Sequence, residues 1–191
     1  MELPRIKPLD FEKAKENAKE AHVLEVYASL NIFATLLRHP KLARGIEKLL
    51  NTLLFEGQLD ARYRELIILR VAWVTKSSYE WAQHYKIGKS FGLSEADITG
   101  IREWRSSDHF DEIDKIILKA CDEILESGEV SESTYAFLVD TLGSDDDFDQ
   151  IFMEIISVVC TWQMVSVLLR SLRVQLEADL DPWPPDGLKP L

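Results

Sequence analysis

The chain has 191 residues, of which 46% are hydrophobic, and a formal net charge of -11. This apolar content is enough to bury a core, and the length suits one domain or two small halves. The acidic balance argues against a nucleic-acid backbone or an anionic membrane as a partner, because both attract basic surfaces. We therefore expect a globular protein without a nucleic-acid or membrane partner.

The cysteine pattern bears on location and redox chemistry. Cys121 and Cys160 lie far apart in the sequence and form neither a CxxC motif nor a zinc pattern. Both lie in apolar helical segments, where a free cysteine usually packs as a small hydrophobe. The N-terminal residues contain no apolar stretch of signal-peptide length, and the uncharged run 155–169 is too short to span a bilayer. These features predict a cytoplasmic protein without disulfides, metals or cofactors.

Helical periodicity and capping residues recur along the chain, which predicts an all-α fold. An extended arm is expected over 1–10, where two prolines fall. Helices are expected, in chain order, over 11–37 in one or two pieces, then over 41–55, 61–75, 77–91, 94–104, 110–126, 131–143 and 148–177. The helix over 61–75 is apolar on nearly all sides, which indicates that it is buried.

The predicted helices divide weakly near Ser106 and Ser107. We expect one helical region over 1–106 and a second helical half over 107–180. The tail over 181–191 contains four prolines, which exclude a helix, and we expect it to lie along a neighbouring surface.

The residues with the most chemical promise fall between positions 60 and 92. Glu65 and Arg70 lie on the apolar helix, and Glu80 and His84 are four positions apart on the next helix, so they share a face. A carboxylate beside an imidazole favours the protonated ring and fixes its orientation. Glu65, Glu80 and His84 are therefore predicted to form an acid/base centre.

This segment resembles the core motif of the carboxymuconolactone decarboxylase/AhpD-like superfamily, in which a glutamate on one helix is followed by C-x-x-C-x-x-x-H on the next. Glu65 falls at the family's glutamate position, and His84 matches the family's histidine. Ser77 and Glu80 fall at the two cysteine positions, so the chain looks like a cysteine-free branch. The phrases RELIILRVAW and YEWAQH also resemble that branch.

The resemblance extends over 31–104 and, less specifically, over 110–177. It implies an AhpD-like helical bundle with a second helical half, a small-molecule substrate or ligand, and a homo-oligomer. It also implies a lyase that acts by proton transfer on a small lactone or carbonyl acid. His84 would carry the proton, Glu65 or Glu80 would orient the ring, and Arg70 would bind the anionic group.

Two other functions stay open at this stage. One is a residual peroxiredoxin or alkylhydroperoxidase activity, although a serine and a carboxylate cannot replace a thiolate pair in two-electron chemistry. The other is a non-catalytic helical oligomer that binds a small apolar ligand.

The individual site residues also have structural interpretations. Ser77 and Glu80 have the spacing of a capping box, in which each would satisfy a backbone N–H at a helix start. Arg70 could pair with Glu65 inside the helix. Tyr79 and Trp81 could line a pocket or simply pack. The predicted substrate-binding residues are Arg70, Ser77, Tyr79 and Trp81.

Overall fold

The computed structural model describes residues 3–143 and 145–191, so the first two residues of the expected arm lie outside the described part. The elements found there are all helical, which confirms the all-α fold. The α-helices are α1 (Phe11–Ala21), α2 (Asn31–Leu36), α3 (Pro40–Asn51), α4 (Ala61–Val74), α5 (Ser78–Ser90), α6 (Glu95–Gly100), α7 (Glu112–Ser127), α8 (Glu132–Leu142) and α9 (Asp146–Leu172). Shorter turns are the 3-10 helices η1 (Glu25–Ser29) and η3 (Ile101–Ser106) and the π-helix η2 (Thr52–Glu56).

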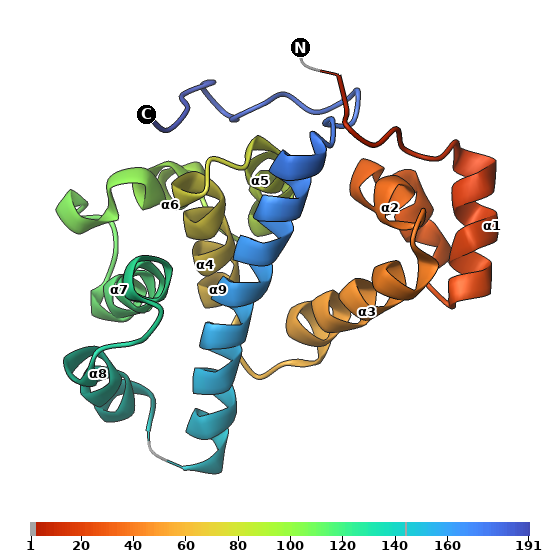
Figure 1. Cartoon of the computed structure of the whole chain (residues 1–191). Helices are drawn as coiled ribbons and strands as arrows, with labels where there is room; N and C mark the ends of the chain where they lie inside the picture. Colours follow the sequence, from red (N-terminus) through yellow and green to blue (C-terminus); the bar gives the residue numbers. More distant parts are fainter. Residues whose placement is uncertain (1–2, 144) are drawn as a thin grey trace.

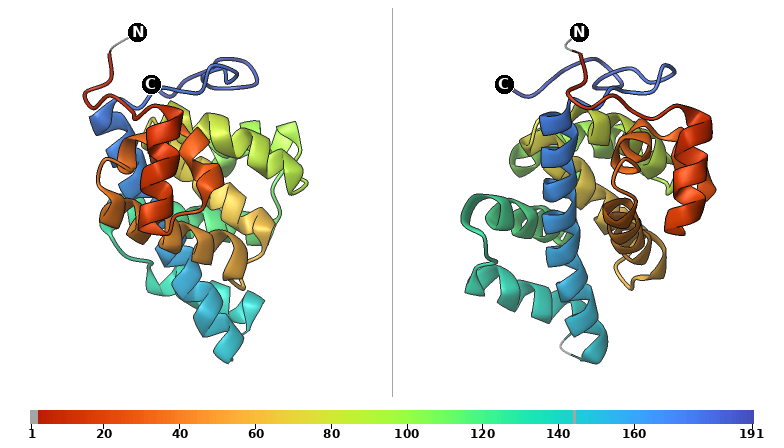
Figure 2. Two further views of the ribbon diagram at one scale, coloured as in Figure 1. Left: turned by 90° about the vertical axis from the view of Figure 1, so that its right-hand side faces the viewer. Right: turned by 45° about the vertical axis from the view of Figure 1, so that its right-hand side comes forward.

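The long helix α9 runs the length of the molecule, with α1 to α3 on one side and α7 and α8 on the other (Figure 1). Two further views show the N-terminal and C-terminal segments crossing the same end of the helical body (Figure 2). Helix α4 contacts α5, α7 and α9. The helices after position 106 therefore pack directly on those before it.

Helix α4 is buried along most of its length, as its apolar sequence predicts. Every residue from Arg64 to Ala72 is buried. Asp60 caps the helix, accepting a hydrogen bond from the backbone N–H of Arg62. Full burial of side chains such as Ile67 and Ile68 contributes about 1.5–3 kcal/mol each relative to exposure. The core thus holds α4 rigidly and with it the side chains that α4 carries.

A tight turn joins α4 to α5. Lys76 adopts the left-handed conformation with φ of 58°, and the N–H of Ser77 donates back to the carbonyl of Ala72. The chain thereby reverses within three residues, and α5 packs against α4. This helical hairpin brings the predicted acidic and imidazole groups together.

Two expected helices differ in the structure, one by being divided and one by ending earlier. The segment 11–37 forms three pieces, because His22 adopts a left-handed conformation (φ 57°) that ends α1, and Leu30, with an extended backbone, separates η1 from α2. Helix α9 stops at Leu172 rather than at 177, because the left-handed Arg173 (φ 55°) turns the chain away. The non-helical tail is accordingly longer than predicted.

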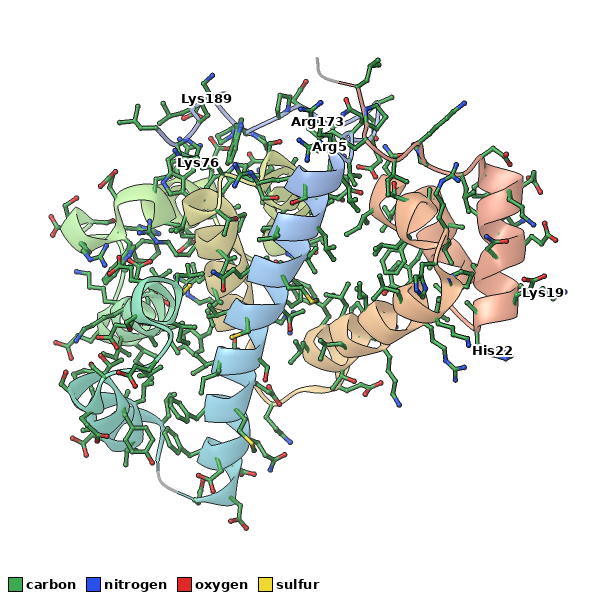
Figure 3. The ribbon with its side chains drawn as sticks, viewed as in Figure 1. Arg5, Lys19, His22, Lys76, Arg173 and Lys189 are labelled. Carbon is green, nitrogen blue, oxygen red and sulfur yellow. The ribbon has the colours of Figure 1, made fainter. Side chains whose placement is uncertain are left out.

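The tail lies along the helical body, as expected. Trp183 is buried, and the indole N–H of Trp81 donates to the carbonyl of Pro184 at 2.8 Å. The guanidinium of Arg102 pairs with both carboxylate oxygens of Asp186, at 2.8 and 3.0 Å. Lys76 and Lys189 lie near this end in Figure 3. The boundaries at 106 and 180 stay predictions.

Helix α9 is long and apolar enough to cross a membrane by length and composition alone. Only 39% of its most apolar window is buried inside the structure. Core helices of soluble proteins meet the same criterion, so this one helix is weak evidence for a membrane span.

Candidate active site

Glu65 and His84 meet between α4 and α5. The Nδ1 atom of His84 lies 2.7 Å from Oε2 of Glu65, and the Glu65 side chain is wholly buried. The second oxygen of Glu65 faces Nε of Arg64 at 3.4 Å. Both carboxylate oxygens thus have a partner, and the hydrogen bond fixes the orientation of the imidazole.

Glu80 lies one turn before His84 on α5. Its Oε2 atom is 3.6 Å from Nε2 of His84, and its side chain is buried. The predicted capping box is absent, because Ser77 makes no side-chain cap at the start of α5. The Oγ atom of Ser77 is buried without a hydrogen-bond partner among the described residues. Glu80 is turned toward His84 instead, so the imidazole lies between two carboxylates.

A residue that the sequence did not indicate completes the cluster. The indole N–H of Trp162, on α9, donates to Nε2 of His84 at 3.1 Å. The two rings meet edge to face, with an interplanar angle of 83°. Trp162 also hydrogen-bonds Glu80. Because Trp162 lies 78 positions after His84, in an apolar helix typical of a core, no local spacing reveals this contact.

Burial disfavours the charged forms of His84 and Glu80, which face each other in this cluster. Desolvation lowers the pKa of His84, but Glu65 and Glu80 outweigh it and hold this pKa above its ordinary value. Burial also raises the pKa of Glu80, although His84 and the hydrogen bond from Trp162 oppose the rise. His84 thus keeps its proton to higher pH than an exposed histidine, and Glu80 is a stronger base than an exposed glutamate.

A cavity of about 120 Å³ opens beside this cluster, between α5, α9 and the segments from η1 to η2. Its wall is largely apolar, with residues such as Ile32, Phe33 and Val165. Its polar members are Tyr27, Tyr79, Glu80, Gln83 and His84. No lysine or arginine is among the residues that line it. Half-buried residues, including Tyr27 and Leu54, connect the cavity to the surface.

Tyr79 anchors one end of the cavity. Its hydroxyl donates to Oε1 of Glu177 at 2.6 Å and accepts from the N–H of Ile32 at 3.3 Å. Gln83 donates to the other oxygen of Glu177 at 2.8 Å. Burial and Glu177 raise the pKa of Tyr79, so the phenol stays protonated. Glu177 belongs to the expected helix 148–177 and was not predicted as a site residue.

Three predicted substrate-binding residues lie outside this cavity. Ser77 is buried before α5, and Trp81 packs with Trp183 on the opposite side, at a ring distance of 6.0 Å. Arg70 pairs with both oxygens of Asp122 at 2.6 and 3.0 Å and donates to two backbone carbonyls. It therefore does not pair with Glu65, the intrahelical alternative left open by the sequence.

The cysteines are free, with Cys121 buried and Cys160 exposed. Burial raises the pKa of the Cys121 thiol, which disfavours the reactive thiolate. Among residues 3–143 and 145–191, no group of three or more His, Cys, Asp or Glu side chains has the arrangement of a metal site.

Sequence comparison agrees with the pattern on α4 and α5. Residues 40–118 match the carboxymuconolactone decarboxylase family. Over this segment, which is less than half of the chain, the sequence is similar to that family. The match includes both helices that carry Glu65, Glu80 and His84. No curated protein is significantly similar to the chain in sequence.

Solved structures share the whole fold at low identity. An alkylhydroperoxidase AhpD core, an uncharacterized peroxidase-related protein from Ralstonia eutropha JMP134, is 15% identical with a TM-score of 0.78, over 94% of this chain and 95% of that chain. A peroxidase-related protein from Silicibacter sp. TM1040 is 19% identical with a TM-score of 0.65, over 94% and 92%. The debrominase Bmp8 is 14% identical with a TM-score of 0.68, over 91% and 92%. A cysteine-to-alanine variant of Bmp8 is solved with 2,3,4-tribromopyrrole. These similarities confirm the AhpD-like helical fold.

Proposed function

We propose that this protein is an acid–base enzyme from a cysteine-free branch of the family, and that it moves a proton on a small, neutral carbonyl compound such as an unsaturated lactone. The supporting observation is the contact of His84 with Glu65 and Glu80, at 2.7 and 3.6 Å, beside an apolar cavity. Glu80 and His84 line that cavity, while Glu65 lies behind the imidazole. The arrangement matches a reacting base and acid supported by a buried carboxylate.

The proposed reaction is a shift of a double bond. The Glu80 carboxylate removes a proton from the carbon next to the carbonyl, and the electrons of the broken C–H bond pass to the carbonyl oxygen. The His84 imidazolium stabilises this negative charge, and Glu65 keeps the ring in place. Glu80 then returns the proton to a different carbon, which restores the carbonyl and leaves the double bond in its new position. No other reactant is consumed.

The charge of the cavity favours a neutral substrate over an anionic one. Glu80 lines the cavity, Glu177 lies behind Tyr79, and no lysine or arginine is among the lining residues. A substrate carboxylate placed there would meet like charges in a poorly solvated site. Arg70, the predicted anion-binding residue, is bound to Asp122 instead. A decarboxylase reaction on a lactone acid is therefore less compatible with this site than isomerisation of a neutral lactone.

The size of the cavity also favours a small substrate. Its volume of about 120 Å³ is below the range of roughly 300–1,000 Å³ that is typical of sites for drug-sized ligands. The similar fold of Bmp8 accommodates 2,3,4-tribromopyrrole, a compact ring compound. A single substituted ring is thus the substrate size that we propose.

Residual peroxidase activity has less support. Cys121 is sealed in the core with a raised pKa, and Cys160 forms no disulfide with it. Homo-oligomeric assembly and a cytoplasmic location also remain proposals, which rest on the family resemblance and on the composition.

A turnover panel tests the proposed function. Neutral β,γ-unsaturated lactones and their carboxylate-bearing analogues are assayed with the wild type, with His84→Gln and with Glu129→Gln, which changes an exposed glutamate. We expect turnover of the neutral lactones only, about 100-fold or more lower in His84→Gln and unchanged in Glu129→Gln. Binding without turnover in the wild type would instead support a non-catalytic ligand-binding module. Equal turnover by wild type and His84→Gln would eliminate the mechanism.

A further inference from the structure

Helix α9 carries an apolar stripe on the side that is turned away from the core. Met153, Met164 and Val167 are 59%, 41% and 57% exposed, and Cys160 between them is exposed as well. Their spacings of seven, four and three positions place these four side chains on one face of the helix. Large apolar side chains that gather on one surface mark a contact with a protein or a membrane.

The N-terminal end of α9 is acidic. Its first turns contain Asp146, Asp147 and Asp149, and all three are exposed. None of these carboxylates forms an ion pair with another residue in the described part of the chain. This end of the helix therefore presents negative charge that the same molecule does not balance.

The C-terminal end of α9 is basic. The guanidinium of Arg170 donates to the carbonyl of Thr75 at 2.7 Å, and the exposed Arg5 donates to the carbonyl of Ser171 at 3.1 Å. Over residues 3–143 and 145–191, neither guanidinium forms an ion pair with a carboxylate, so each keeps an unbalanced charge. Arg173 lies at the same end of the helix (Figure 3).

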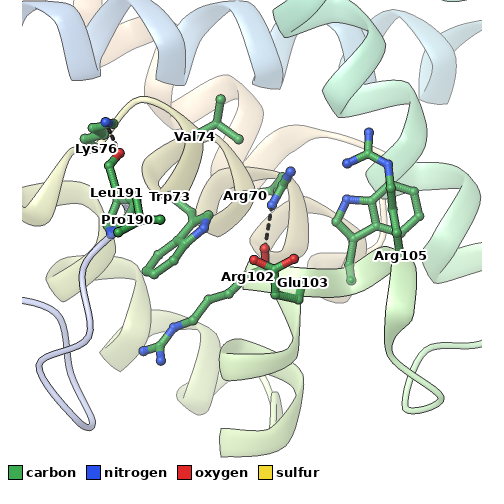
Figure 4. A pocket seen from close by; sticks show the side chains of 10 residues that line it. Arg70, Trp73, Val74, Lys76, Arg102, Glu103, Arg105, Pro190 and Leu191 are labelled. Carbon is green, nitrogen blue, oxygen red and sulfur yellow. Dashed lines mark hydrogen bonds between the residues drawn. The ribbon is translucent and has the colours of Figure 1, made fainter.

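The cations around the cavity at the end of α4, which Figure 4 shows from close by, are different. There Asp122 pairs with Arg70 and Arg105, and Glu126 also faces Arg105. Lys76 donates to the main-chain oxygen of the last residue. The positive charges at that cavity are thus matched within the molecule, whereas the charges at the two ends of α9 are not.

We propose that α9 pairs in antiparallel orientation with α9 of a second copy of this chain. The antiparallel orientation brings the acidic end of each helix to the basic end of the other, and the two apolar stripes cover each other. A parallel pair would place like charges side by side. The orientation matters because copies that each carry a net charge of -11 otherwise repel one another. This inference does not depend on the proposed reaction at His84.

The sequence of the stripe also fits a twofold axis at Cys160. Met153 precedes Cys160 by seven positions, and Val167 follows it by seven. With Cys160 on the axis, Met153 of one copy faces Val167 of the other, and Ile156 likewise faces Met164. Each apolar side chain then has an apolar partner, and the small cysteine lets the two helices approach closely.

Size exclusion with light scattering measures the mass of the wild type, of Val167→Glu and of Val26→Glu. The control changes a valine of η1 that is also exposed. We expect the mass of two chains for the wild type and for Val26→Glu. We expect the mass of one chain for Val167→Glu, because pairing would bury an unpaired carboxylate. Circular dichroism establishes that each variant is folded.

A short bis-maleimide reagent tests the orientation, since Cys121 is buried and Cys160 is the exposed thiol. We expect the reagent to link wild-type chains in pairs. In a Cys160→Ser background, Met153→Cys and Val167→Cys should be linked when they are mixed, and neither should be linked alone. Two copies of position 153 are about 21 Å apart in the antiparallel pair, at about 1.5 Å per residue.

A charge reversal tests the complementarity of the two ends. Asp149→Lys places a cation opposite the basic end of the second copy, so the dissociation constant of the pair should rise about tenfold or more. Asp108→Lys makes the same change at an exposed position before α7 and should leave the dissociation constant unchanged. Analytical ultracentrifugation measures both constants.

The proposal is overturned if the wild type has the mass of one chain, or if Val167→Glu keeps the wild-type mass. It is overturned as well if Met153→Cys is linked to itself as readily as to Val167→Cys, or if Asp149→Lys and Asp108→Lys pair equally well. A single wild-type chain that sediments with phosphatidylcholine vesicles would also overturn it, because the exposed stripe would then contact a membrane surface.

Discussion

The indole N–H of Trp162 donates to Nε2 of His84 across 3.1 Å, so a residue of the long helix α9 contacts the acid–base pair on α5. The same indole also hydrogen-bonds Glu80. In the neutral ring Nε2 is an acceptor, and in the charged ring it is a donor. The indole N–H of Trp162 can therefore donate to Nε2 of the neutral His84 ring or, when Nε2 is protonated, to the Glu80 carboxylate.

Trp162→Phe removes this donor and retains an aromatic ring. We expect the pKa of His84 to rise further, because the lost hydrogen bond favoured the neutral imidazole. The pKa of Glu80 should rise as well, since the hydrogen bond from Trp162 lowers it. An NMR titration of the His84 ring in wild type and variant measures the first effect. An unchanged or lowered His84 pKa would show that Trp162 only packs there.

The raised pKa of His84 makes stability depend on pH. The folded state holds this proton more tightly than the unfolded chain, whose histidine pKa is about 6.5. The resulting stabilisation is fully present below that pH and is lost as pH rises through the raised folded pKa. The raised pKa of Glu80 acts in the same direction, beginning near its ordinary value of 4.5.

We therefore expect the free energy of unfolding of the wild type to fall more steeply between pH 6 and pH 9 than that of His84→Gln. Urea unfolding of both proteins at the two pH values measures this difference. Parallel curves would mean that His84 has the same pKa in the folded and unfolded states.

Arg70→Met separates a structural role for Arg70 from a substrate-binding role. Arg70 is buried and paired with Asp122, so its removal leaves a buried carboxylate with fewer partners. We expect a loss of about 3 kcal/mol in the free energy of unfolding, and turnover at saturating neutral lactone close to that of the wild type at a temperature where the variant is folded. A large rise in KM with normal stability would support the substrate-binding role instead.

Asp186→Asn tests how the tail is held. Arg102 pairs with Asp186 through two hydrogen bonds, which hold the pKa of that carboxyl at about 2. Losing the charge should loosen residues 181–191 and expose Trp183. We expect faster proteolysis in this segment and a red-shifted tryptophan emission. Equal proteolysis of wild type and variant would indicate that Trp183 alone anchors the tail.

The sequence predicted most of the features that depend on neighbouring residues, such as helix positions and buried faces. Asp60 caps α4 and Gly128 ends α7 in a left-handed conformation, both close to the helix bounds that the sequence predicts, and the apolar pattern of α4 correctly indicated burial. The pairing of Glu65 with His84 was also anticipated, because a helical hairpin brings these two positions together.

The rest of the site depends on contacts between distant segments. Trp162 and Glu177 reach the cluster from α9 and the chain after it, and nothing in their local sequence distinguishes them from packing residues. Arg70 was assigned to substrate because its partner, Asp122, lies 52 positions later. The capping box is absent because the N–H of Ser77 already donates to the carbonyl of Ala72, and Glu80 lies toward His84 instead.

The central claim is that Glu80 and His84 move a carbon-bound proton inside the cavity beside α5. The most direct measurement is the incorporation of solvent deuterium into a neutral unsaturated lactone, followed by NMR in D₂O. We predict incorporation by the wild type and by Glu129→Gln, with Glu80→Gln slower by about 100-fold or more. Equal incorporation by Glu80→Gln and the wild type would contradict the account.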